Sequence, residues 1–269
     1  MIETYILDSF TSEPFKGNPA GVCILDKAIN PSKMQSIATE LGLSETAFIK
    51  KEKRSPNYSI RFFSPVTEIP LCGHATLASS KVIFENNPTL TDFQFKNIEG
   101  LDLPIRKEGH MIEMIFPIYE TEPLAAPPAL LIALGLTSVI NSVYNEETNI
   151  LLLEIEDSNI LQKLSPNFVE LVKSHDSING VLVSARSKQV AYDFESRYFW
   201  PWTGTNEDPV TGATHTFLAK YWSSRLNKTK MNSFQCSERT GSMVVELIDE
   251  DKMTIKGEAH IILKGQLRI

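Results

Sequence analysis

The sharpest candidate for chemistry in this chain of 269 residues is Glu45. It lies at the edge of a segment that is otherwise apolar, Thr-Ala-Phe-Ile at positions 46–49. A carboxylate brought into an apolar cleft becomes a usable proton shuttle near neutral pH. A glutamate at a strand edge in contact with water would have no such role, and the residue pattern alone leaves both interpretations open.

His74 and Asp208 are the next candidates, because each lies close to the start of an expected helix. In the first turn of a buried helix, the positive helix end favours a neutral imidazole, which would make His74 a hydrogen-bond partner and not a cation. Asp208 would either bind a substrate or cap the second helix. A purely structural role is equally open for both residues.

Two glycines, Gly73 and Gly212, are expected at the starts of these helices. A helix N-terminus presents unpaired N–H groups and a partial positive charge, and glycine lets a ligand approach the backbone closely. Two such ends facing each other would hold an anion, such as a carboxylate, between them. The alternative is that each glycine only relieves a tight turn, but a matched pair favours the binding role.

Cys72, two residues before His74, suggests a thiolate activated by the helix end or a pair of metal ligands. A metal needs three or four ligands, and only Cys72, His74 and Asp208 are nearby candidates, so we expect no metal. The expected role of Cys72 is that of a small buried residue. The chain has no serine nucleophile elbow, phosphate-binding loop or GxGxxG motif, so no nucleotide cofactor is expected.

The segments around these residues occur twice along the chain. Arg-Phe-Phe-Ser-Pro at 61–65 resembles Arg-Tyr-Phe-Trp-Pro at 197–201. The pattern Glu-x-Pro-x-x-Gly occurs at 68–73 and again at 207–212. Each copy precedes a helix rich in small residues, so the order indicates an internal duplication.

The three candidates for chemistry break the symmetry of this duplication. In the alignment of the two copies, His74 faces Ala213, Asp208 faces an isoleucine, and Glu45 falls near residues 179–180. Structural residues should recur in both halves of a duplicated chain, whereas residues that do chemistry need not. The asymmetry therefore supports a chemical role for all three.

Hydrophobic periodicity together with the duplication predicts an α+β fold. We expect two pseudo-symmetric domains, each a curved, mostly antiparallel sheet or barrel around a central buried helix. The first domain should cover residues 1–117, joined by the last strand at about 262–269, and the second residues 118–261. The buried helices are expected at 74–85 and 212–226 and further helices at 31–42, 129–135 and 166–174; strands are expected at 2–8, 20–26, 45–50, 58–63, 138–145, 149–156, 180–185 and 191–199, with further strands within 92–117 and three within 232–269.

Composition restricts the partners and the compartment. The chain has 26 Lys and Arg against 33 Asp and Glu, a net charge of −7, whereas nucleic acid and anionic membranes demand an excess of basic residues. The three cysteines are far apart and form no CxxC, as expected of reduced thiols. The N-terminal segment resembles no secretory signal, and no apolar stretch is long enough to span a bilayer. We expect a cytoplasmic protein without nucleic-acid or membrane partners.

Four motifs occur in register along the chain. They are Phe-Lys-Gly-Asn-Pro-Ala-Gly-Val at 15–22, Leu-Ser-Glu-Thr-Ala-Phe at 43–48, Phe-Ser-Pro through Leu-Cys-Gly-His-Ala-Thr-Leu at 63–77, and Glu-Asp-Pro-Val-Thr-Gly at 207–212. Together they resemble the PhzF-like isomerases of phenazine biosynthesis over nearly the whole chain. The resemblance implies a diaminopimelate epimerase-like fold, with the active site in the cleft between two similar domains.

The resemblance also implies roles for individual residues. Glu45 would be the acid/base that removes a proton from one carbon and returns it to another, while His74 and Asp208 hold and polarise the substrate. No cofactor or metal is implied, the partner is a small carboxylate, and a homodimer fits the family. The residues implied to bind the substrate or receive its carboxylate are Asn18, Gly73, Gly212 and Ala213.

Local departures from the family pattern concern the substrate more than the reaction. Gly-Ala-Thr at 212–214 replaces the usual Gly-Ser-Ala, and Gln235-Cys236 replaces Gln-Gly. Related epimerases use two cysteines, but Cys72 faces Thr211 here. We expect a cofactor-independent isomerase that moves a proton between carbons of a small carboxylate, either amino-acid-like or cyclohexadiene-like. A non-catalytic metabolite-binding protein on the same fold and an amino-acid racemase or epimerase are the alternatives.

Overall fold

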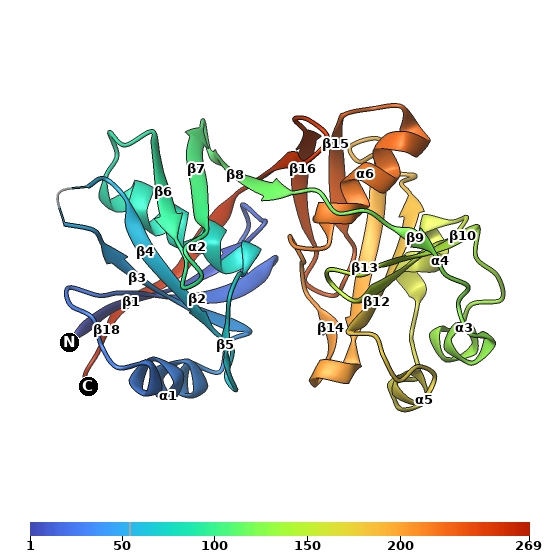
Figure 1. The fold of residues 1–269 in the computed structure, drawn as a ribbon, viewed down its shortest axis with the longest axis horizontal. Coiled ribbons are helices and arrows are strands. Elements are labelled where there is room, and N and C mark those ends of the chain that lie inside the picture. Colours follow the sequence, from blue (N-terminus) through green and yellow to red (C-terminus); the bar gives the residue numbers. More distant parts are fainter. Residues whose placement is uncertain (54) are drawn as a thin grey trace. The chain divides into compact units, whose positions relative to one another are not determined.

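A computed structural model describes residues 1–53 and 55–269, and its chain forms two compact units. Unit 1 comprises Met1–Phe116 and Thr254–Ile269, and unit 2 comprises Pro117–Met253 (Figure 1). The chain thus leaves unit 1 and returns to it with its C-terminal segment. The return lies at Thr254, whereas the sequence pattern placed it at about 262.

Unit 1 combines a mostly antiparallel sheet with a buried helix. Strands β1–β2, β1–β18, β3–β4, β4–β5, β6–β7 and β7–β8 pair antiparallel, whereas β2–β3 and β4–β6 pair parallel. The elements are β1 (Ile2–Ser9), β2 (Asn18–Ile24), α1 (Pro31–Leu41), β3 (Glu45–Lys51), β4 (Tyr58–Phe63), β5 (Glu68–Ile69), α2 (Gly73–Asn86), β6 (Asp92–Lys96), β7 (Asp102–Glu108), β8 (Met111–Pro117) and β18 (Ala259–Leu267).

Unit 2 repeats this order of pairings. Strands β10–β11, β12–β13, β13–β14 and β15–β16 pair antiparallel, whereas β11–β12 and β13–β15 pair parallel. The elements are β9 (Glu122–Pro123), α3 (Pro128–Leu134), β10 (Asn141–Asn145), β11 (Ile150–Glu154), α4 (Ser158–Lys163), α5 (Phe168–Lys173), β12 (Gly180–Arg186), β13 (Phe194–Trp200), the 3-10 helix η1 (Pro201–Thr203), β14 (Thr205–Asp208), α6 (His215–Leu226), β15 (Lys230–Gln235) and β16 (Gly241–Leu247).

The last strands explain why the return to unit 1 begins earlier than expected. β17 (Lys252–Gly257) pairs with β8 of unit 1 and ends only one residue before β18 begins. At the break between them, the Glu258 carbonyl accepts hydrogen bonds from the backbone N–H groups of Phe10 (2.8 Å) and Thr11 (3.2 Å). This interruption lies within a continuous stretch of strand-like sequence, so the pattern shows one strand where the structure has β17 and β18.

The helix α2 is buried on almost every side. Gly73 through Ser80 are all buried, as are Val82, Ile83 and Phe84, and the helix packs against β1, β2, β3 and β18. A run rich in Ala, Ser, Thr and Gly suits this position, since small side chains let the surrounding strands approach the helix from several directions. The buried helix predicted from the composition of this segment is present.

The helix α6 begins three residues later than predicted, at His215 and not at Gly212. Residues 212–214 form a turn instead. In this turn the N–H of His215 donates to the carbonyl of Gly212 (3.0 Å), and the N–H of Thr216 donates to that of Ala213 (3.2 Å). These i to i+3 bonds are of the tighter 3-10 type, which often precedes an α-helix and leaves no signal in the apolar pattern.

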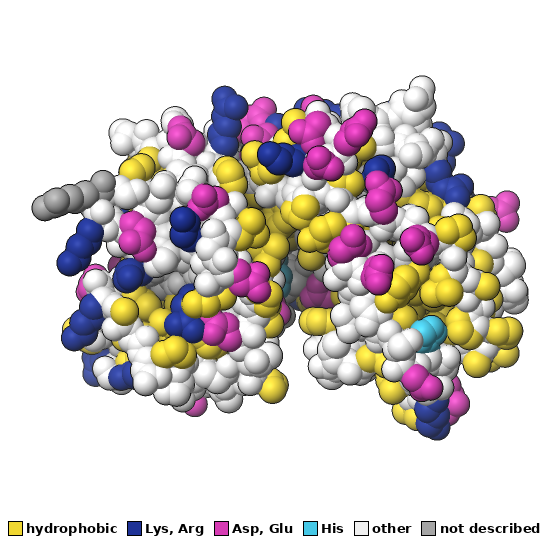
Figure 2. Space-filling model, in the orientation of Figure 1, with side chains coloured by type: hydrophobic (Ala, Val, Ile, Leu, Met, Phe, Trp, Pro, Cys, Tyr) yellow, Lys and Arg dark blue, Asp and Glu magenta, His cyan; other side chains and the backbone are white. Residues whose placement is uncertain are grey.

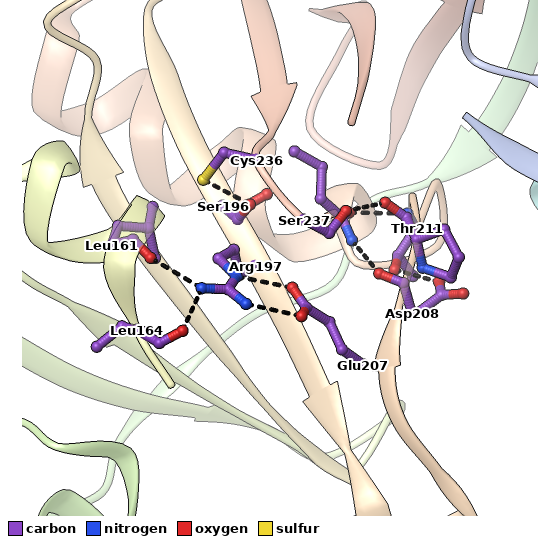
Figure 3. Close-up of polar contacts among 11 residues, drawn as sticks. Leu161, Leu164, Ser196, Arg197, Glu207, Asp208, Thr211, Cys236 and Ser237 are labelled. Carbon is purple, nitrogen blue, oxygen red and sulfur yellow. Dashed lines mark hydrogen bonds and ion pairs between the residues drawn. The ribbon is translucent and has the colours of Figure 1, made fainter. Parts of the chain in front are cut away.

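A bidentate ion pair occurs at matching positions of the two units. Arg61 donates to the Glu68 carboxylate at 2.7 and 2.6 Å. Arg197 donates to Glu207 at 2.7 and 2.7 Å and also to the carbonyl of Leu164 (2.7 Å; Figure 3). The repeat found in the sequence thus corresponds to a repeated structural contact.

We expect the two ion pairs to differ in their effect on stability. The side chains of Arg197 and Glu207 are 11% and 18% exposed, against 23% and 27% for Arg61 and Glu68. Glu207→Gln should therefore lower the free energy of unfolding by about 2–3 kcal/mol, because it leaves a buried guanidinium without its counter-charge. The matched variant Glu68→Gln should lower it by about 1 kcal/mol. Urea denaturation of both variants measures the difference, and equal losses would contradict this interpretation.

Charged side chains are mixed on the surface. On the face drawn in Figure 2, Lys and Arg side chains are interspersed with Asp and Glu side chains. In the part of the chain drawn in colour there, this face carries no continuous basic surface. No helix of the described chain is both long and apolar enough to cross a membrane.

Candidate functional site

Glu45 and His74 form a buried pair in unit 1. Glu45 is the first residue of β3 and His74 the second residue of α2, and the two elements pack against each other. His74 Nε2 lies 3.0 Å from Glu45 Oε2, and the residues are only 6% and 8% exposed. Of the two interpretations that the sequence left open, the structure has the buried glutamate, and the histidine beside it supplies a charge partner.

Cys72 completes this group, which we call the Glu45 cluster (Glu45, Cys72 and His74). Its sulfur lies 3.5 Å from His74 Nδ1 and 3.9 Å from Nε2, and the residue is buried. Burial raises the pKa of the Cys72 thiol, so the sulfur stays protonated at neutral pH. The sequence pattern predicted a small buried residue here but gave no sign that its thiol contacts the imidazole.

The charge of His74 differs from the expectation. Burial alone lowers the pKa of this imidazole, but the charge of the Glu45 carboxylate and the hydrogen bond to the Cys72 sulfur raise it, and the net pKa lies well above its usual value. His74 is therefore an imidazolium paired with a carboxylate. In the sequence, only the positive helix end was visible, and it favours the neutral form. A carboxylate at 3.0 Å outweighs that partial charge.

The Glu45 cluster also has the residue types of a metal site. Its three ligand atoms lie within 4.8 Å of one another. Metal binding requires a thiolate and a neutral imidazole. The raised pKa values of Cys72 and His74 oppose both requirements. The protonation states of Cys72 and His74 thus favour the ion pair of His74 and Glu45 over a metal site.

The start of α2 and the start of β2 border the Glu45 cluster. Gly73 is the first residue of α2, and in the described chain no side chain caps this helix start. Asn18 is fully buried and accepts a hydrogen bond from the Ser44 hydroxyl at 3.3 Å. Since β2 and β3 pair parallel with Ala20 opposite Glu45, the predicted residues Asn18, Gly73, Glu45 and His74 lie close together in unit 1.

Asp208 ends β14 in unit 2 and is held in a hydrogen-bonded loop. The hydroxyl of Thr211 donates to Asp208 Oδ2 (Figure 3). The Gln235 side chain donates to the carbonyl of Asp208 (2.7 Å) and accepts from the N–H of Thr211 (2.8 Å). Gln235 is fully buried and clamps both ends of the loop. Nothing in the sequence pattern predicts this role of Gln235, whose amide bonds one backbone donor and one backbone acceptor.

The turn after this loop contains Gly212 and Ala213. Gly212 is buried and Ala213 is exposed. The hydroxyl of Thr214, which replaces the usual alanine, donates to the carbonyl of Thr211 (3.0 Å) and so stabilises the turn. Asp208, Gly212 and Ala213 are thus neighbours in unit 2, but the last two precede the helix and do not begin it.

His215 is a buried histidine with the opposite character to His74. Its Nδ1 lies 3.0 Å from the carbonyl of Thr211, and its Nε2 lies 2.6 Å from the Ser233 hydroxyl. A carbonyl only accepts, so Nδ1 carries the proton and Nε2 accepts from Ser233. Burial lowers the pKa of His215 to about 4, which keeps the ring neutral. This histidine supports the turn, and within the described residues no carboxylate pairs with it.

Comparison with known proteins places the chain in one family. The model of the family described as "Phenazine biosynthesis-like protein" (PhzC-PhzF) matches residues 7–265. A mouse protein, "Phenazine biosynthesis-like domain-containing protein 1", is 40% identical, with 98% of each chain covered. A Pseudomonas aeruginosa protein named as an uncharacterized isomerase is 39% identical, with 98% of this chain and 97% of that protein covered.

A solved structure extends the match to three dimensions. The crystal structure of a PhzC/PhzF protein from Clostridium difficile has a TM-score of 0.90 and 37% identity, with 100% of both chains covered. The predicted α+β fold class and the predicted family are both confirmed. With matches of this length in the sequence and in the fold, the chain belongs to the phenazine biosynthesis-like PhzC-PhzF family.

Proposed function

We propose that the protein is an isomerase that moves a proton between carbons of a small carboxylate, with Glu45 as the acid/base. The observation that carries the proposal is the buried pair of Glu45 and His74, with 3.0 Å between the carboxylate and the imidazole. The isomerase names of relatives at 39% and 38% identity agree with this class of reaction.

The Glu45 cluster suits proton transfer between carbons. The Glu45 carboxylate would take a proton from a carbon α or allylic to the substrate carboxylate, and the C–H electron pair would pass into the conjugated system. Negative charge then moves from Glu45 to the substrate. The imidazolium of His74 stabilises both arrangements, because it lies beside the carboxylate before the transfer and beside the new anion after it. Glu45 returns the proton to a different carbon, so no oxidant or reductant is consumed.

The remaining predicted residues would bind the substrate. The N–H groups at the start of α2, at Gly73, offer hydrogen bonds and a partial positive charge to a carboxylate. In the proposal, Asn18, Asp208, Gly212 and Ala213 also contact the substrate. The cluster needs no cofactor for this reaction, since every step is a proton transfer.

Cyclohexa-2,5-diene-1-carboxylate in D2O tests the proposal, with L-proline as the amino-acid probe. An isomerase removes the C1 proton and protonates C3, which produces a conjugated diene with new ultraviolet absorbance and deuterium at C3. A racemase would instead exchange the α proton of proline with loss of optical rotation. A metabolite-binding protein would gain thermal stability from a probe and never convert it. Either of these last two results would refute the isomerase.

A further inference from the structure

Gly180 occupies the position in unit 2 that Glu45 occupies in unit 1. In unit 1, Ala20 of β2 pairs with Glu45 of β3, and in unit 2 Ile150 of β11 pairs with Gly180 of β12, both in parallel register. The next residue along each strand pairs with a phenylalanine of the following strand. At the position where unit 1 has the Glu45 carboxylate, unit 2 therefore has a residue without a side chain.

The space above Gly180 is filled by the ring of Tyr198. A Cβ atom added at Gly180 would lie 2.6 Å from Cε2 of Tyr198 and 2.7 Å from its hydroxyl oxygen. Nonbonded contacts of a Cβ atom are essentially never this short, so glycine is required for the ring to lie there. The matching residue of unit 1 is Phe62, which has no hydroxyl. The polar group at this position is thus the Tyr198 hydroxyl of β13 in unit 2, whereas in unit 1 it is the Glu45 carboxylate of β3.

Among the described residues, the hydroxyl of Tyr198 forms no hydrogen bond. Tyr198 is 5% exposed, and within residues 1–53 and 55–269 its hydroxyl has no hydrogen-bond partner. The hydroxyl oxygen is not fully buried either, because it is not among the fully buried side-chain polar atoms that lack a partner in the described chain. Those atoms are Thr46 Oγ1, Ser79 Oγ, Ser158 Oγ, Ser196 Oγ, Trp200 Nε1 and Thr254 Oγ1.

Tyr198 also lies beside Asp208, a predicted substrate-binding residue. The two residues are directly paired in the antiparallel register of β13 and β14, so their side chains share one face of the sheet. Burial, together with the charge of Asp208, raises the pKa of Tyr198. The phenol therefore stays protonated at neutral pH and is a permanent donor.

We propose that the Tyr198 hydroxyl, made possible by Gly180, donates a hydrogen bond to an oxygen atom of the carboxylate substrate. This inference rests on the proposed function and adds a specificity-determining residue to it. A neutral phenol donates a hydrogen bond to the substrate without competing for its proton. It selects carboxylates over uncharged analogues, because an anionic acceptor strengthens the bond.

Tyr198→Phe tests the donor with least disturbance of the fold. We expect the dissociation constant of cyclohexanecarboxylate, a carboxylate that cannot react, to rise about 10-fold or more, as for the loss of a hydrogen bond to a charged group. With the reactive diene as probe, KM should rise by a similar factor. Tyr192→Phe is the matched control, because this tyrosine of unit 2 stacks on Phe234 outside the predicted site, and it should leave both constants unchanged.

A spectroscopic readout separates contact from a structural role. In protein labelled with 13C at tyrosine Cζ, the signal that disappears in Tyr198→Phe should shift when cyclohexanecarboxylate binds to the wild type. Gly180→Ala, which displaces the ring, should weaken binding in the same way. If the wild type binds the probe while the Tyr198 signal stays still and Tyr198→Phe binds equally well, the role of Tyr198 is refuted and the isomerase proposal stands. A wild type that binds no carboxylate probe refutes both.

Discussion

Replacing Glu45 by glutamine should slow deuterium incorporation into cyclohexa-2,5-diene-1-carboxylate by about 10³-fold or more. The amide has nearly the shape of the carboxylate but cannot accept a proton, so the variant removes the general base and keeps the shape of the side chain. Positioned general bases contribute about 10²–10⁴-fold to proton transfers, and here Glu45 would serve in both half-reactions. Exchange is followed by NMR, and isomerisation by the absorbance of the conjugated product.

Binding of an inert carboxylate should respond differently from turnover. Glu45 is an anion, so it contributes no attraction to a carboxylate ligand, and the dissociation constant of cyclohexanecarboxylate should change little in Glu45→Gln. Glu40→Gln is the control, since Glu40 is an exposed glutamate of α1. Its exchange rate should equal that of the wild type. Undiminished exchange in Glu45→Gln would eliminate Glu45 as the base.

Glu45→Gln should also change the charge of its partner. Without the carboxylate, burial is the largest remaining influence on His74 and lowers the pKa of the imidazole. The variant would then hold a neutral histidine beside a neutral amide. This avoids the full cost of an unpaired buried charge at neutral pH, so the variant should remain folded and its kinetics should be measurable.

The duplication is the part of the structure that the sequence predicts best. The alignment that sets Asp208 opposite Ile69 appears in the strand register, where Ile69 pairs with Phe62 and Asp208 with Tyr198. The alignment of Glu45 with residues near Gly180 likewise agrees with the strand register, because β3 pairs parallel with β2 just as β12 pairs parallel with β11. Repeated motifs retain their spacing because each copy must form the same strands, so a one-dimensional comparison is sufficient.

Contacts between distant segments are what the sequence does not show. The charge of His74 depends on Glu45, which lies on another element and contacts it only after folding. The unused hydroxyl of Tyr198 becomes visible only when the ring is found over Gly180. The clamp that Gln235 forms around the Asp208 loop has the same origin. In each case the residue type was visible in the sequence, but its partner was not.

The two buried histidines should give the folding free energy a maximum in pH. His215 has a folded-state pKa of about 4, below the value of about 6.5 for an unfolded histidine. Between these values the unfolded chain binds the proton and the folded chain does not, so stability is lost as the pH falls from 6.5 towards 4. The loss from this residue should reach about 3 kcal/mol.

His74 should act on the other side of the maximum. Its folded-state pKa is raised, so the folded chain keeps a proton that the unfolded chain releases near pH 6.5. The stabilisation from the pair with Glu45 is therefore complete below pH 6.5 and is lost as the pH rises through the folded-state pKa. The slope should approach about 1.4 kcal/mol per pH unit, the limit for one proton.

Single substitutions test whether His215 causes the loss of stability at low pH and His74 the loss at high pH. Urea unfolding between pH 4 and 9 gives the free energy of unfolding, and other carboxylates contribute equally to wild type and variant. His215→Asn keeps a donor for the Thr211 carbonyl but cannot titrate. The difference in the free energy of unfolding between the wild type and this variant should therefore shrink as the pH falls. For His74→Gln the difference should shrink as the pH rises above 6.5. If the stability difference between the wild type and His74→Gln is constant from pH 6 to 9, His74 is neutral. Glu45 would then lack the imidazolium that stabilises negative charge during the proton transfer.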